Sequence, residues 1–338
     1  MKKYEKEVIK AQLDHEKQVL KDLEKNYKEA LLEIDSRIAQ LLGRGDSDMQ
    51  HVVYQVEFQK ALRKQIETIL DQLHNNEFET ITEYLTACYE EGFIGELYCL
   101  QEQGIPLVFP VDQEQVVAAV QHETKLKESL YTRLGKDVGE LKKQIAGEIS
   151  RGISTGMMYD EISRNLAGYA GINRNKAATI VRTESHRIQV KAAENAIEKA
   201  KKAGADIVEK WDATLDGKTR PHHRELDGKL REDDGYFHYS GGRVKAPSQF
   251  GIAAEDINCR CRLGSTAKWL LDVEETKYLG NTKKMTDKQL QPIADKLHID
   301  VEELKKYSDQ IIPVKAKDFD DFRRQYEKIW NAKPVEKG

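Results

Sequence analysis

The sequence predicts an α+β protein that is predominantly helical in its N-terminal and middle regions and has a small α+β unit near its C-terminus. Charged residues make up 33% of the chain, hydrophobic residues 39% and aromatic residues 7%, a balance typical of long solvated helices around thin cores. Apolar residues recur at helical spacing as far as Ala203. After Gly204 short alternating segments and turns rich in Asp, Gly, His and Pro replace the helical pattern.

The N-terminal region contains two amphipathic helices. Apolar residues return every three, four or seven positions from Ile9 to Leu41, and the glycine-containing stretch 43–47 ends this stripe. A second stripe runs from Val52 to Leu73, so an antiparallel helical hairpin is predicted. We expect a third helix over 77–91 and weaker helical order around the glycines that follow it, which are Gly92, Gly95 and Gly104.

An apolar segment over 104–110 is bracketed by two prolines and predicts an extended connector at a domain boundary. Helical periodicity resumes over 112–134, 138–150, 159–169 and 173–203, with glycines between these pieces. The predicted organisation is a helical region at 1–104, a connector and helix at 105–135, a second helical region at 136–204, an α+β unit at 205–265 and a short helical tail at 266–338.

Two strands are predicted in the α+β unit, at 207–211 and at 259–263. Alternation along the second strand would place Cys259 and Cys261 on one face and Arg260 and Arg262 on the other.

The bulk properties limit where the protein acts. The net charge of −4 gives the whole molecule no strong attraction for nucleic acid or anionic membranes. No run of about twenty apolar residues occurs, and the N-terminus is charged, so we expect neither a signal peptide nor a membrane partner. Four unevenly spaced cysteines do not form a secreted disulfide framework, and reduced thiols are expected.

Four groups of residues follow one another between Arg182 and Leu263. They are Arg182 with Glu184; Trp211 with Asp216, Arg220 and His223; Asp227 with Gly228; and Pro247 with Asn258, Cys259 and Cys261. In order and spacing this segment resembles the head morphogenesis family of tailed phages, the Mu F-like minor head proteins. Family members often have a cysteine near the position of His222 or His223, which this sequence lacks.

The resemblance implies a phage or prophage minor capsid protein that acts in head morphogenesis near the portal vertex. It implies the portal protein and other capsid or scaffold proteins as partners, with double-stranded DNA as a further one. The protein would be located in the virion, and in the host cytoplasm during assembly. No chemical reaction comes with the resemblance, so a non-enzyme is expected. As a mechanism, we hypothesise that the stripes between Ile9 and Leu73 supply a helix-in-groove or coiled-coil contact with the portal.

The residue types of a tetrahedral zinc site are present in His222, His223, Cys259 and Cys261. Against this, Cys-x-Cys is shorter than the usual spacing between zinc ligands. The alternative is that both cysteines are small buried apolar groups, while Asn258 caps a turn and the neighbouring arginines pair with carboxylates. We expect no cofactor, with zinc as the alternative.

A metal-dependent nuclease or effector centred on His222, His223 and Asp216 is the rival function, because histidine and carboxylate side chains perform such hydrolysis. No nucleophile elbow, zinc-protease motif or phosphate-binding glycine loop accompanies them. In the structural alternative Asp216 makes a tight turn with Gly217, Arg220 forms a buried ion pair and the histidines bond to loop backbone.

Arg182 shares a helix face with His186 and Gln189 and would point into the α+β unit. Residues 136–204 contain 13 Lys/Arg against 8 Asp/Glu, and this local excess makes a nucleic-acid-binding packaging factor a third hypothesis. A solvated helix face has the same composition. The candidate DNA contacts are Arg174, Lys176, Arg187, Lys191, Lys199, Lys201 and Lys202.

Overall fold

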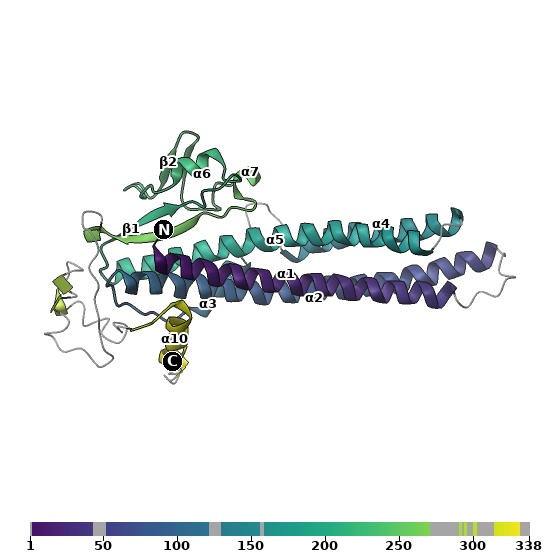
Figure 1. The fold of residues 1–338 in the computed structure, drawn as a ribbon, viewed down its shortest axis with the longest axis horizontal. Coiled ribbons are helices and arrows are strands. Elements are labelled where there is room, and N and C mark those ends of the chain that lie inside the picture. Colours follow the sequence, from purple (N-terminus) through teal and green to yellow (C-terminus); the bar gives the residue numbers. More distant parts are fainter. Residues whose placement is uncertain are drawn as a thin grey trace. The chain divides into compact units, whose positions relative to one another are not determined.

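The structure is a computed structural model that describes residues 2–42, 52–121, 130–155, 159–270, 291–292, 294–295, 300–302 and 314–331. Most of the described residues are helical, and two small antiparallel sheets accompany them, as the predicted fold class requires (Figure 1). The chain divides into two compact units. We call residues 15–84 with 121–182 the bundle unit, and residues 1–14, 85–120 and 183–338 the mixed unit.

Long helices dominate the first two thirds of the chain. They are α1 (Lys3–Leu42), α2 (Val52–Glu102), α3 (Gln113–Gln121), α4 (Leu130–Thr155) and α5 (Tyr159–Lys202). The predicted end of the first helix before Gly43 and the start of the second at Val52 are confirmed. The predicted breaks at Gly135, Gly152 and Gly171 are wrong, because α4 and α5 continue through them, whereas the break at Gly204 is confirmed by the end of α5 at Lys202. The predicted break at Gly156 lies outside the described residues.

The bundle unit is an antiparallel arrangement of four helical segments. Residues early in α1 meet residues late in α2: the rings of His15 and Tyr84 lie 4.8 Å apart, and Tyr27 Oη lies 3.0 Å from Glu77 Oε1. This order of contacts confirms the predicted hairpin. In the same way α4 and α5 run in opposite directions, since Lys176 bonds to Glu140 while Asn165 bonds to Glu148 nearer the connection.

The bundle core comes from the apolar stripes of all four segments. Its buried members are Tyr27, Ile34, Ile38, Ile66, Ile69, Leu70, Leu73, Val138, Leu141, Ile145, Ile149, Ile162, Leu166 and Ala170. Part of the stripes between Ile9 and Leu73 is thus packed within the chain, while Leu13 and Leu32 are exposed, and a helix-in-groove or coiled-coil contact with a portal subunit stays a prediction.

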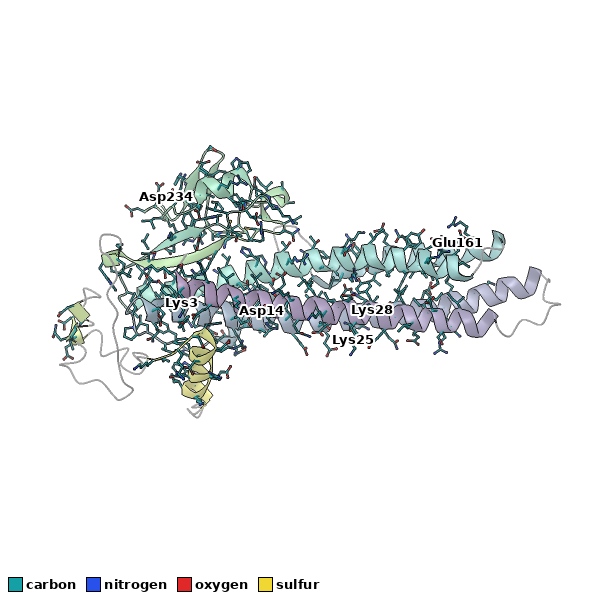
Figure 2. All side chains as sticks on the ribbon, in the orientation of Figure 1. Lys3, Asp14, Lys25, Lys28, Glu161 and Asp234 are labelled. Carbon is teal, nitrogen blue, oxygen red and sulfur yellow. The ribbon has the colours of Figure 1, made fainter. Side chains whose placement is uncertain are left out.

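The solvent faces of α1 carry mixed charges, as Figure 2 shows around Lys25 and Lys28. Lys25 lies 3.7 Å from Glu29 and Lys28 lies 3.1 Å from Glu24, both at helical spacing of four. Such exposed pairs add little to stability, so the apolar core holds the bundle.

Two glycines inside α2 mark close packing and do not end the helix. A Cβ on Gly92 would lie 2.7 Å from the carbonyl oxygen of Gln189, and a Cβ on Gly95 would lie 2.6 Å from Val8 Cγ1. The predicted loss of helical order near Gly92 is therefore wrong: the glycines let α1, α2 and α5 approach closely within the mixed unit.

Two small sheets lie in the mixed unit (Figure 1). Strand β1 (Ile207–Asp212) pairs antiparallel with β4 (Arg262–Ala267), so that Trp211 faces Leu263 across the ladder. Strands β2 (Phe237–Tyr239) and β3 (Gly242–Val244) form a hairpin. The short elements are α6 (Pro221–Leu226), α7 (Ala253–Asp256) and η1 (Lys268–Leu270), and α10 (Phe319–Asn331) follows in the tail.

The first strand is confirmed, but the second begins at Arg262, later than predicted. Cys259 and Cys261 therefore precede β4. Asn258 lies in the turn that follows α7 and has a left-handed φ of 53°. Among the described helices, none is both long and apolar enough for a bilayer span.

Candidate functional site

Three residues with metal-binding side chains meet in the interior of the α+β region. They are His223, Cys259 and Cys261, each at most 3% exposed. Their ligand atoms all lie within 4.8 Å of one another. His223 Nδ1 is 3.1 Å from Cys261 Sγ and 3.7 Å from Cys259 Sγ.

Helix α6 brings His223 to this position. Pro221 occupies its first turn, where the missing N–H costs nothing, and two histidines follow. Because neighbouring helix positions point in different directions, His223 is buried while the side chain of His222 is 39% exposed. The turn after α7 supplies the cysteines: the Asp256 carboxylate accepts the N–H groups of Phe250 and Gly251 and fixes this turn.

Glu255 orients both histidines. Its two carboxylate oxygens lie 3.0 Å from His222 Nδ1 and 3.1 Å from His223 Nε2. With Nε2 donating to Glu255, the unprotonated Nδ1 of His223 faces the two sulfurs. A buried imidazole with a fixed orientation and an open lone pair is thereby aimed at two thiols.

The two thiols influence each other's titration. A hydrogen bond from Cys261 lowers the pKa of Cys259, and that same bond together with burial raises the pKa of Cys261.

Aromatic rings enclose this cluster. Trp211 is fully buried and meets His223, Phe237 and Phe250 edge to face. Phe250 also stacks on the His223 ring at 4.9 Å. The buried indole N–H of Trp211 has no hydrogen-bond partner among the described residues. These rings surround the thiols with apolar surface.

Residues 143–264, which contain this cluster, match the family described as Phage Mu protein F like protein. The minor head protein GP7 of Bacillus phage SPP1 is 29% identical to the chain over 252 residues, which are 73% of this chain and 81% of that protein. The chain therefore contains a Mu F-like region at residues 143–264 and is similar over most of its length to a minor head protein. The resemblance seen in the sequence motifs is thereby confirmed.

Another relative of this Mu F-like chain is the NAD(+)–arginine ADP-ribosyltransferase EFV of Enterococcus faecalis (strain ATCC 700802 / V583). It is 32% identical over 263 residues, which are 77% of this chain and 54% of that protein. The chain thus spans about half the length of this relative, and the activity in the relative's name is not carried over. No solved structure matches the chain significantly.

Several motif residues of the Mu F-like region shape its backbone. Asp227 accepts the N–H of Ala213 at 2.8 Å, and Gly228 takes a positive φ of 76° and donates its N–H to the carbonyl of Trp211. Only glycine adopts this conformation without strain. Pro247 is buried. These residues have structural roles.

Arg220 was expected to form a buried ion pair, and this expectation is wrong. Its guanidinium donates to the carbonyl oxygens of Glu255 and Ile257, at 3.1 and 2.6 Å. Arg220 therefore connects the start of α6 to the end of α7. This connection helps to hold Glu255 against the two histidines.

The rival nuclease centre is not assembled. Asp216 lies in a tight turn, as the structural alternative predicted, where its carboxylate accepts the backbone N–H of Lys218. The same carboxylate forms two hydrogen-bonded contacts with the Arg260 guanidinium, at 2.6 and 2.8 Å. The carboxylate beside His222 and His223 comes from Glu255. The expectation that the histidines bond to loop backbone is wrong, because His222 and His223 both bond to the Glu255 carboxylate.

Arg182 was expected to point from the helix into the α+β region, but His186 makes that contact. Arg182 bonds to Glu16 at 3.1 Å within the bundle unit. One turn later His186 makes the contact, with Nδ1 2.7 Å from Ser248 Oγ and Nε2 2.6 Å from the carbonyl oxygen of Cys261. Nearby, Glu184 pairs with Arg187.

Arg262 pairs with carboxylates, as predicted, but the sequence did not indicate which ones. It is 2.8 Å from Glu96 and 3.2 Å from Glu5, and it also donates to Cys99 Sγ at 3.1 Å. Burial raises the pKa of Glu96 to about 7 although Arg262 acts in the opposite direction. The sequence analysis also missed Glu255. Its position four residues before Cys259 was the one signal that it lies near the candidate site.

Each candidate DNA contact has a partner within the chain. Lys199 donates to the carbonyl oxygen of Pro110 and lies over the Phe93 ring. The other six pair with carboxylates: Arg174 with Glu24, Lys176 with Glu140, Arg187 with Glu184, Lys191 with Glu194, Lys201 with Glu209 and Lys202 with Glu198.

Proposed function

We propose that this protein is a structural, non-enzymatic component of a phage or prophage capsid that acts in head assembly and associates with the portal protein. The main support for this proposal is the match to the SPP1 minor head protein, which covers 81% of that protein and 73% of this chain. The fold supports the same role. Long solvated helices with a packed core and a compact mixed unit suit an assembly component.

The site geometry supports a structural role in preference to a nuclease. His223 is 2% exposed behind Trp211 and Phe250, so a phosphodiester has no direct approach to its imidazole. Asp216, the other residue of the rival centre, is held by Arg260.

Incorporation into heads tests this proposal. Heads purified from a strain that carries an epitope-tagged copy of the gene should contain the protein, and it should co-elute with the portal protein of the same genome when the two are co-expressed. Trp211→Ala removes a ring from the core of the family-matched region, whereas Arg260→Ala removes only an exposed ion pair there. We expect the first variant to lose incorporation and the second to keep it.

Two results would contradict the proposal. One is absence of the protein from heads together with no association with the portal. The other is specific cleavage of DNA or RNA in Mg²⁺ or Mn²⁺ that is lost in His223→Ala, which would replace the structural role with an enzymatic one.

Contact between this protein and DNA stays a prediction from the sequence. All seven candidate cations already have partners within the chain, so a phosphate would have to displace them. If these residues do bind DNA, affinity should fall steeply between 50 and 200 mM salt because counterions are released, by on the order of 10³-fold for about six phosphate contacts.

A further inference from the structure

We propose that His223, Cys259 and Cys261 bind a zinc ion through one imidazole nitrogen and two thiolates. This inference does not depend on the capsid role. It begins from the donor set, because sulfur and imidazole are the ligands that zinc takes in protein sites. Among the residues that the structure describes, these three form the group whose ligand atoms converge.

The distances fit one ion. In a tetrahedral site with Zn–S near 2.3 Å and Zn–N near 2.05 Å, a sulfur and a nitrogen lie about 3.6 Å apart. The two sulfur distances from His223 Nδ1 are 3.1 and 3.7 Å, on either side of that value. All three ligand atoms lie within 4.8 Å of one another, as one shared ion requires.

The histidine is already oriented as a zinc ligand. A ligating imidazole commonly donates its second N–H to a carboxylate, which fixes the tautomer and strengthens the donor nitrogen. Glu255 occupies that position at 3.1 Å from Nε2. His222 bonds to the other oxygen of Glu255 and lies outside the converging group, so it is not part of the proposed ligand set.

The surroundings also suit metal-bound sulfur. Cys259 is 3% exposed and Cys261 is 2% exposed, so bulk water competes little with their sulfurs for an ion. On binding, Zn²⁺ replaces the two thiol protons, which leave to solvent, so the ion and its two thiolates are neutral together. Three protein ligands would leave the fourth position of a tetrahedral ion to an exogenous ligand such as water.

The ion would join two segments that lie far apart in the sequence. His223 lies in α6, whereas Cys259 and Cys261 lie in the turn before β4. Zinc would cross-link these segments beneath Trp211, in a region with two short sheets and little regular structure. Its role would be to hold the Mu F-like region together.

Metal analysis of the full chain, purified without a histidine tag and without chelators, tests the proposal. We expect about one zinc per chain in the unaltered protein and at least a tenfold lower content in Cys261→Ser. Cys88→Ser is the matched control, since Cys88 is equally buried but lies in α2, and it should keep its zinc. Glu255→Gln should keep the site but weaken zinc about 10- to 100-fold in competition with a chelator.

A measurement on the unaltered protein covers the case in which Cys261→Ser does not fold. After removal of metal, Co²⁺ should give the visible bands of a tetrahedral ion and the thiolate-to-cobalt charge-transfer band, and Zn²⁺ but not Mg²⁺ should abolish them. The proposal is overturned if neither zinc nor cobalt binds, if Cys261→Ser retains zinc, or if Cys259 and Cys261 prove to be joined as a disulfide.

Discussion

The bundle unit buries apolar side chains that the sequence already marks by their spacing, whereas the mixed unit buries charged and metal-ligating groups whose partners are far away in the chain. In the bundle, Ile145 packs among other apolar residues at helical spacing. In the mixed unit, Arg262 contacts Glu5 and Glu96, and His223 contacts Cys261. The difference teaches that local periodicity predicts where helices pack, while long-range polar pairs need the folded structure.

The largest expected loss of stability follows from removing a buried cation of the mixed unit. Arg262→Met leaves the buried Glu96 without its cation, which should lower the free energy of unfolding by about 3–5 kcal/mol. Adding Glu96→Gln should recover much of this loss, because the stranded carboxylate is then removed. Urea unfolding of the single and double variants measures the coupling. Strictly additive losses would show that the two side chains do not depend on each other.

An apolar truncation tests the bundle in the same way. Ile145 is fully buried, so Ile145→Ala should lower the free energy of unfolding by about 2–5 kcal/mol through lost burial and a cavity. Ile172, on α5 of the same unit, is 56% exposed, and Ile172→Ala should change stability by less than about 0.5 kcal/mol. Urea unfolding compares the two. Equal effects would mean that the bundle core is not packed as described.

Glu77 is one of the buried polar side chains of the bundle, and it predicts a pH dependence. Burial raises the pKa of Glu77 to about 7. The Tyr27 hydroxyl lies between Glu77 and Asn173 Oδ1 and has a single proton, so a neutral Glu77 can donate to Tyr27 while Tyr27 donates to Asn173.

The folded state therefore binds more protons than the unfolded state between about pH 4.5 and 7, and stability should fall as pH rises through this window, by on the order of 3 kcal/mol. Glu77→Gln should flatten that dependence in hydrogen-exchange protection of α2, while Glu79→Gln, at an exposed position of the same helix, should leave it unchanged. An unchanged slope in Glu77→Gln would assign the effect to another group.

The smallest effect is expected for an exposed pair in the mixed unit. Arg260 and Asp216 form a two-fold ion pair, but both side chains are largely solvated. Arg260→Ala should therefore shift the midpoint of thermal unfolding by less than about 2 °C. Differential scanning calorimetry measures this. A shift as large as that of Arg262→Met would place Arg260 among the buried determinants of the fold.

The sequence predicted the helices and the first strand well because their signal is local. It failed at glycines, since Gly92 and Gly95 are required by close helix packing and not by a turn. In the candidate site, the motif residues His223, Cys259 and Cys261 were found, and alternation correctly placed the two cysteines on one side, although both precede the strand that begins at Arg262. Glu255 and Glu96 were missed because their roles depend on partners elsewhere in the chain.

The contacts of Arg262 also bear on how the protein is made. Glu5 is 257 positions away from it in the chain, so a ribosome that adds roughly 5–20 residues per second produces the carboxylate roughly 10–50 s before the arginine. During that interval Glu5 and Glu96 face water or other partners. The strand β1 likewise waits for β4, so the mixed unit closes late in synthesis, after the helices of the bundle unit are complete.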